Sequence, residues 1–249
     1  MYLRFKRVSV ATVALVAIVT IAVTFRPDAS RFSETQCECR MKQIGLALLL
    51  YHDTHSVFPA SRDAGHSWRI RVLPYMTYSP QYVAYDFDQS WDAENNITVD
   101  TRPLPDKHGD LVAFGNPYGP PCDVDVQHLT CYLAICGENA FLGPTLKRRM
   151  AEISDGIENT IAAAEVAQSN VHWLSPVDLD LEEMSFVINN GPQSISSSHP
   201  SGPAVCFCDG TVFRINPAID PKIVRGLCTI NGGEQISRDA LIEEGLLIP

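Results

Sequence analysis

An uncharged apolar run near the N-terminus, Val8–Phe25, constrains this chain more than any other segment. Ten of its residues are Val, Ile, Leu or Phe, and as an α-helix the run is about 27 Å long, close to the ~30 Å hydrocarbon core of a bilayer. Arg4, Lys6 and Arg7 precede it, which favours a cytoplasmic N-terminus. We therefore expect a single-pass anchor in the cell inner membrane that contacts the lipid bilayer through Val8–Phe25.

Two other interpretations of this run are a cleaved signal peptide and a buried core helix. Ala22-Val23-Thr24 is a poor match to a signal-peptidase site, so we expect the run to be kept. Pro27 then interrupts the helix within a polar hinge, Arg26–Ser33. The expected organisation is a basic stub, anchor and hinge in residues 1–31, followed by an extracytoplasmic domain in residues 32–249.

Composition excludes several classes of protein. The 249 residues are 45% hydrophobic and 19% charged, which is typical of a folded domain rather than a disordered chain. A net charge of −10 repels nucleic acid, so we expect no nucleic-acid partner. The eight cysteines are too few for a dense disulfide framework in a chain of this length. One or two disulfides stay open as an alternative to buried thiols.

Helical periodicity returns after the hinge. Ile44, Ala47, Leu48 and Tyr51 share one face of a predicted helix over Met41–Tyr51. Further leucines widen the apolar arc, so we expect burial on more than one side. A glycine inside this helix, at position 45, indicates close approach of another backbone.

A β-hairpin is predicted late in the chain. Two apolar runs in Ala204–Ile215 are separated by Asp209-Gly210, which predicts a two-residue type I′ turn with Cys206 opposite Phe213. Both faces are apolar, so the hairpin is expected at the centre of a sheet. The remaining expectations are a loop-rich middle from Ala60 to Pro144, a buried strand at Cys131–Cys136, a strand or short helix at Thr160–Val166, and apolar tail segments at Ile223–Thr229 and Leu241–Leu247.

Several segments, taken in order, resemble a planctomycete-type family of pilin-like membrane proteins, the domain of unknown function numbered 1559. Its signature is a histidine, nine residues and Asp-Gly, which fits His199, Asp209 and Gly210. The other matching segments are KQIGLAL, YHDTHSVFP, SWRIRVLPY, YDFDQSWD, YLAICG, ISDGIENTI with AEV, HWLSPVDL and INGGEQIS. Together they cover Cys37–Ser237, and their order is more specific than any one of them.

The resemblance implies a loop-rich α+β pilin-like fold, in which the N-terminal membrane-spanning helix and the amphipathic helix pack on an antiparallel β-sheet. It also implies kinship with type II secretion pseudopilins and type IV pilins, and envelope or secretion-system partners. One feature departs from the prepilin-type N-terminus: KRVSVATVAL has neither the glycine at the cleavage point nor the glutamate that follows it. We therefore expect a permanently anchored domain.

Candidate metal ligands are present without a metal-binding motif. His52 and His55 share a helical face, but no second pair of zinc ligands has a recognisable spacing. Asp86, Asp88 and Asp92 offer oxygen ligands that calcium accepts, although their spacing is not that of an EF-hand. We expect no bound metal and no cofactor.

No motif for a catalytic nucleophile is present, and the hairpin should hold His199 and Asp209 far apart. We therefore expect no catalytic residues and assign His199 a structural hydrogen bond. The expected function is a pilin-like or pseudopilin-like structural or interaction protein of the cell envelope. The alternatives are a solute-, peptide- or glycan-binding module and, third, an envelope hydrolase. The binding module would use aromatic loops at Trp68, Tyr85, Trp91 and Trp173.

Overall fold

The computed structural model describes residues 29–76, 79–106, 108–112, 115–119 and 128–249. Its centre is a six-stranded sheet of order β12-β11-β10-β7-β6-β9. The neighbouring strands are antiparallel except for β6 and β9, which are parallel, so the expectation of a purely antiparallel sheet is wrong at this edge. The strands are β6 (Tyr132–Cys136), β7 (Ile161–Glu165), β9 (Leu179–Asp180), β10 (Ala204–Phe207), β11 (Val212–Ile215) and β12 (Leu247–Ile248).

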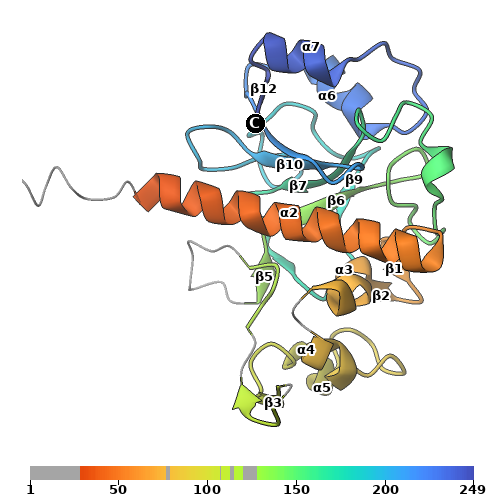
Figure 1. The fold of residues 1–249 in the computed structure, drawn as a ribbon, viewed down its shortest axis with the longest axis vertical. Helices are drawn as coiled ribbons and strands as arrows, with labels where there is room; N and C mark the ends of the chain where they lie inside the picture. The colour runs from red at the N-terminus through yellow and green to blue at the C-terminus, as the bar shows by residue number, and fades with distance from the viewer. Residues whose placement is uncertain (1–28, 77–78, 107, 113–114, 120–127) are drawn as a thin grey trace, which may run out of the picture.

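One long helix, α2 (Ala29–His55), lies across one face of this sheet (Figure 1). It contacts β7, β10 and β11. Its buried side is formed by Met41, Ile44, Ala47, Leu48 and Tyr51. These residues confirm the predicted amphipathic helix packed on the hairpin.

The outward side of α2 differs from the expectation. Leu46 is 56% exposed and Leu50 is 39% exposed, so the helix is buried on one side only. Residues 29–33, expected in the hinge, are helical. The predicted anchor, Val8–Phe25, lies outside the described residues. Among the helices that the structure does describe, none has the length and apolar character needed to cross a membrane.

The sheet separates two hydrophobic cores. Alternate residues of a strand point to opposite faces, and β10 shows this directly. Ala204 and Cys206 belong to the core beneath α2, whereas Val205 and Phe207 belong to the core on the other face. The second core is covered by α6 (Pro221–Cys228) and α7 (Arg238–Glu243), which lie at the top of Figure 1.

The middle of the chain is built from short elements, as its Pro- and Gly-rich sequence predicts. Those labelled in Figure 1, namely β1, β2, α3, α4, α5, β3 and β5, lie below α2 in that view. The elements are β1 (Arg62–Asp63), β2 (His66–Ser67), α3 (Trp68–Val72), the 3₁₀ turn η1 (Leu73–Tyr75), α4 (Ser79–Ala84), α5 (Glu94–Ile97), β3 (Leu104–Pro105), β4 (Leu111–Val112), β5 (Leu129–Thr130), η3 (Met150–Glu152) and β8 (Val171–His172).

The predicted hairpin is present and central, but its register differs by one residue. Cys206 pairs with Val212 rather than with Phe213. The amide of Phe207 donates to the carbonyl of Thr211 at 2.9 Å, so the loop is Cys208–Gly210. Within this loop only Gly210 has a positive φ, +83°, whereas a type I′ turn requires a positive φ at both central residues. The turn is therefore the three-residue type that ends on a left-handed glycine.

Candidate functional site

Three of the four aromatic residues expected in a binding loop belong to the hydrophobic core. Trp68 and Trp173 are fully buried and Tyr85 is 5% exposed. Trp91 is partly buried and lies against the ring of His172, with centroids 5.5 Å apart. The structure therefore does not bring the four side chains together on an exposed surface.

The polar ends of these buried aromatics are satisfied inside the protein. The indole nitrogen of Trp68 donates to Asp178, and that of Trp173 donates to Asp100 at 3.0 Å. The hydroxyl of Tyr85 lies 2.8 Å from Nδ1 of His66. Burial raises the pKa of Tyr85 well above its ordinary value, so its hydroxyl stays neutral. These partners indicate a packing role.

The predicted calcium ligands stabilise their own loop. The carboxylate of Asp86 accepts from the amide of Asp88 and from the side chain of Gln89, both at 2.9 Å. That of Asp92 accepts from the hydroxyl of Ser90 at 2.5 Å. In the part of the chain that the structure describes, these carboxylates form no group that could hold one ion.

The two histidines at the end of α2 pack separately. His55 stacks on Tyr51 with ring centroids 4.1 Å apart, and its Nδ1 lies 3.0 Å from the carbonyl of Tyr51. His52 packs against Phe58, with centroids 4.5 Å apart. These contacts match the packing alternative to a zinc site.

Asp209 and Gly210 of the signature form the hairpin turn. Asp209 accepts from the amide of Thr211 at 2.9 Å and from Arg238 at 2.5 Å. Burial acts to raise the pKa of Asp209, but the hydrogen bonds from Thr211 and Arg238 outweigh it and lower that pKa below its ordinary value. Asp209 therefore has a structural role at the opposite end of β10 from His199.

His199 belongs to a buried polar cluster that the sequence did not reveal. Its Nε2 lies 3.3 Å from Sγ of Cys37 and 3.3 Å from Oε1 of Glu165. These residues come from α2, the end of β7 and the loop before β10. Cys37 is 1% exposed, Glu165 5% and His199 8%. We refer to them as the Cys37–Glu165–His199 cluster.

The surroundings hold this cluster in place. The second carboxylate oxygen of Glu165 accepts from the amide of Ala204 at 3.0 Å, and the amide of His199 donates to the hydroxyl of Ser197 at 3.1 Å. Tyr132 packs beside Cys37. The pKa of Tyr132 is raised mainly by burial and further by the neighbouring Cys131, Cys37 and Glu165. The hydroxyl of Tyr132 therefore stays neutral and adds no charge to the cluster.

The cluster does not have the geometry of a nucleophilic relay. In a catalytic triad one ring nitrogen of the histidine faces the nucleophile and the other faces the carboxylate. Here Cys37 and Glu165 both face Nε2 of His199. The arrangement resembles converging ligands instead. One feature of the sequence could have indicated the cluster. Glu165 is a charged residue within the apolar run IAAAEV, and a buried charge needs a polar partner.

A second polar centre surrounds the ion pair between Arg69 and Asp178, both without exposed side-chain area. Nη2 of Arg69 lies 2.7 Å from Oδ1 of Asp178, and the guanidinium also donates to the carbonyl of Tyr132. Asp178 accepts from Ser61, from Trp68 and from the amide of Ala134. The pair joins α3 to β6 and to the segment before β9.

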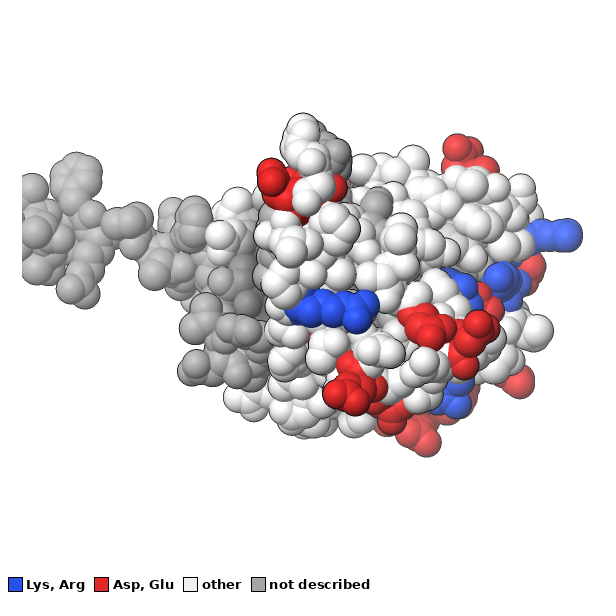
Figure 2. Space-filling model, turned by 90° about the horizontal axis from the view of Figure 1, so that it is seen from below, with Lys and Arg blue, Asp and Glu red and all other residues white. Residues whose placement is uncertain are grey.

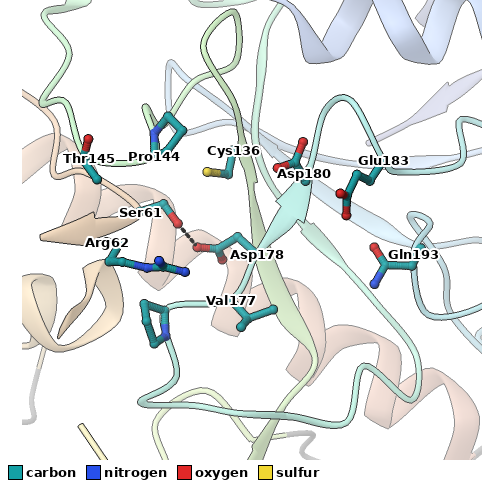
Figure 3. Close-up of a pocket in the computed structure, with 11 residues that line it drawn as sticks. Ser61, Arg62, Cys136, Pro144, Thr145, Val177, Asp178, Asp180, Glu183 and Gln193 are labelled. Carbon is teal, nitrogen blue, oxygen red and sulfur yellow. Dashed lines mark hydrogen bonds between the residues drawn. The ribbon is translucent and has the colours of Figure 1, made fainter. Parts of the chain in front are cut away.

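An open cleft of about 290 Å³ lies beside this ion pair (Figure 3). Arg62 lies on the opposite side of the cleft from Glu183 and Gln193, and the Ser61–Asp178 hydrogen bond is at its base. Burial raises the pKa of Cys136, which also lines the cleft, to about 11. That thiol is therefore a poor nucleophile near neutral pH.

The remaining buried thiols are also unreactive. Cys206, Cys208 and Cys228 are buried and form no disulfide, and Cys39 is an exposed free thiol. Burial raises the pKa of both Cys206 and Cys228 to about 12. These residues act as small apolar side chains.

A family model matches part of the chain. Residues 31–131 match the model of a family described as "Protein of unknown function (DUF1559)". This supports the resemblance to that family over α2 and the middle of the chain; the signature residues His199, Asp209 and Gly210 lie beyond the matched segment. No curated protein and no solved structure matches the chain.

Proposed function

We propose that this chain is a membrane-anchored, pilin-like structural or interaction protein of the cell envelope, with residues 32–249 outside the cytoplasmic membrane. The observation that carries the proposal is the position of α2. Its C-terminal half is buried on the sheet, and its beginning extends past the strands (Figure 1). A domain built on the buried half of a helix that follows an apolar run in the sequence suits anchoring.

Two features favour a non-catalytic role, and the surface charge favours a protein partner. Three of the four aromatic residues expected in a binding loop fill the core, and the thiols of Cys136, Cys206 and Cys228 have raised pKa values. The view from below shows a large uncharged area with scattered charged residues, more of them Asp and Glu than Lys and Arg (Figure 2). Such a face suits protein partners better than nucleic acid or anionic lipid.

The cleft beside Asp178 favours the second candidate, a binding module for a small polar solute. Its volume of about 290 Å³ is at the lower end for small-molecule sites. The lining includes the carboxylates of Asp180 and Glu183 and the guanidinium of Arg62. A polar ligand with both donors and acceptors would suit it.

Topology is tested with alkaline phosphatase fused after Ser33, because that enzyme is active only outside the cytoplasm. We expect an active, membrane-bound fusion. The matched control lacks Val8–Phe25 and should be inactive. An inactive fusion after Ser33 would overturn the orientation. Mass spectrometry of the mature N-terminus should find Met1 or a start before Val8; a start beyond Ala22 would mean release from the membrane.

Partners are tested by pull-down of the full chain from membranes, with and without crosslinking. A ladder of self-crosslinked species would indicate a filament subunit, and a distinct second protein would indicate a scaffold. Both results agree with the proposal. Recovery of the chain alone, together with saturable binding of a solute that is lost in Glu183→Gln, would contradict it and favour the binding module.

A further inference from the structure

We propose that the Cys37–Glu165–His199 cluster binds one divalent transition-metal ion and that Zn²⁺ suits it best. From the sequence alone no bound metal was expected. The weak candidate ligands named there, Asp86, Asp88 and Asp92, belong to a different loop. The cluster is also independent of the proposed envelope function.

The spacing of the three ligand atoms is that of a coordination sphere. Zn–S bonds are about 2.3 Å and Zn–N and Zn–O bonds about 2.0–2.2 Å, so two ligands at a tetrahedral angle lie about 3.3–3.6 Å apart. Nε2 of His199 lies 3.3 Å from both Sγ of Cys37 and Oε1 of Glu165. All three atoms lie within 4.8 Å of one another, so small side-chain rotations would place them around one ion.

Hydrogen bonding alone accounts poorly for this convergence. A single imidazole nitrogen carries either one proton or one lone pair. It can form one good hydrogen bond, yet Nε2 of His199 is equally close to a sulfur and to a carboxylate oxygen. An ion between the three atoms would satisfy all of them at once.

The charges also balance. Binding would release the proton of the Cys37 thiol to solvent, which leaves one thiolate, one carboxylate and a neutral imidazole. Together with a divalent cation they give a net charge of zero, which suits a site that is almost fully buried. A mixed sulfur, nitrogen and oxygen set favours zinc over calcium or magnesium.

The surrounding protein is arranged as around known metal sites. Three protein ligands leave a fourth position for a water molecule, as in zinc sites that stay open. The amide of Ala204 orients the carboxylate of Glu165 from behind, the kind of outer contact that tunes a ligand. The bound ion would join α2 to β7 and to the segment that enters β10.

The experiment uses the full chain in detergent, stripped with a chelator and then titrated with Zn²⁺ or Co²⁺. We expect one equivalent of tightly bound metal that survives gel filtration. Co²⁺ should give a thiolate-to-metal charge-transfer band, and Zn²⁺ should raise the melting temperature because it binds the folded state. A wild-type chain that retains no stoichiometric metal would overturn the proposal.

Substitutions identify the ligands. In Cys37→Ser the charge-transfer band should vanish, and in Glu165→Gln and His199→Gln the Zn²⁺ affinity should fall by more than about 100-fold, beyond the loss typical of outer contacts. Cys39→Ser, on the exposed side of the same helix, is the matched control and should bind normally.

Circular dichroism checks that each variant folds. If Cys37→Ser does not fold, the wild-type Co²⁺ spectrum and Glu165→Gln still decide the question. Equal binding by Cys37→Ser and wild type would show that the metal is not held by this cluster and would overturn the proposal.

Discussion

The buried carboxylate of Asp178 holds several segments of the chain together. Its carboxylate accepts from Arg69, Trp68, Ser61 and the amide of Ala134. A buried ion pair costs desolvation, and good geometry with further hydrogen bonds offsets that cost. Removal of one partner leaves the other charged and unpaired.

Asp178→Asn should therefore lower the free energy of unfolding by about 3–5 kcal/mol, because Arg69 loses its counter-ion. The exposed pair between Lys42 and Glu38 supplies the control. Glu38→Gln should change stability by less than about 1 kcal/mol. Urea unfolding measures both. Similar losses in the two variants would contradict the importance assigned to Asp178.

Asp209 should contribute pH-dependent stability. Its pKa in the folded protein is lowered, because the hydrogen bonds from Thr211 and Arg238 outweigh burial. A lowered folded-state pKa gives stability that is present above the unfolded value of about 3.9 and is lost as pH falls through the folded value. The stability difference between wild type and Asp209→Asn should thus be constant near neutral pH and shrink in acid. A difference that grows below about pH 4 would contradict this assignment.

The contact between α2 and the hairpin turn depends on Gly45. A Cβ there would lie 2.5 Å from Sγ of Cys206 and 3.3 Å from backbone atoms of Gly210. The sequence predicted a close backbone approach at this position, and the structure confirms it. The absent side chain lets the helix sit directly on the turn.

Gly45→Ala tests whether this packing outweighs helix propensity. Alanine favours an isolated helix by about 1 kcal/mol over glycine, whereas overpacking costs about 1–3 kcal/mol. We expect net destabilisation in urea unfolding. Adding Cys206→Ala should give a favourable coupling energy in a double-mutant cycle. Leu46→Ala, on the exposed side of α2, should have little effect, and a stabilised Gly45→Ala would refute the tight contact.

The hairpin shows what local sequence could and could not predict. Asp-Gly correctly indicated a turn between two strands, but it suits two loop lengths. The amide of Phe207 bonds to Thr211, so Cys208 belongs to the loop. Its buried position beneath α2 shows that helix packing, which local residues do not encode, selects the longer loop.

Across the whole molecule, one sheet carries two cores. Helix α2 and the short middle elements cover one face, and α6 and α7 help to cover the other. This explains why the strands at Tyr132–Cys136 and Ile161–Glu165 are buried at every position. The buried strand expected at Cys131–Cys136 is confirmed, and Thr160–Val166, expected as a strand or a short helix, contains a strand.

Patterns along the chain were enough to locate the C-terminal half of α2, β6 and the central hairpin, because periodicity and turn residues act over a few positions. The parallel edge strand β9, the burial of Trp68 and Trp173, and the meeting of Cys37, Glu165 and His199 could not be predicted that way. Each depends on contacts between segments far apart in sequence, which form only when the sheet orders and its two faces are covered.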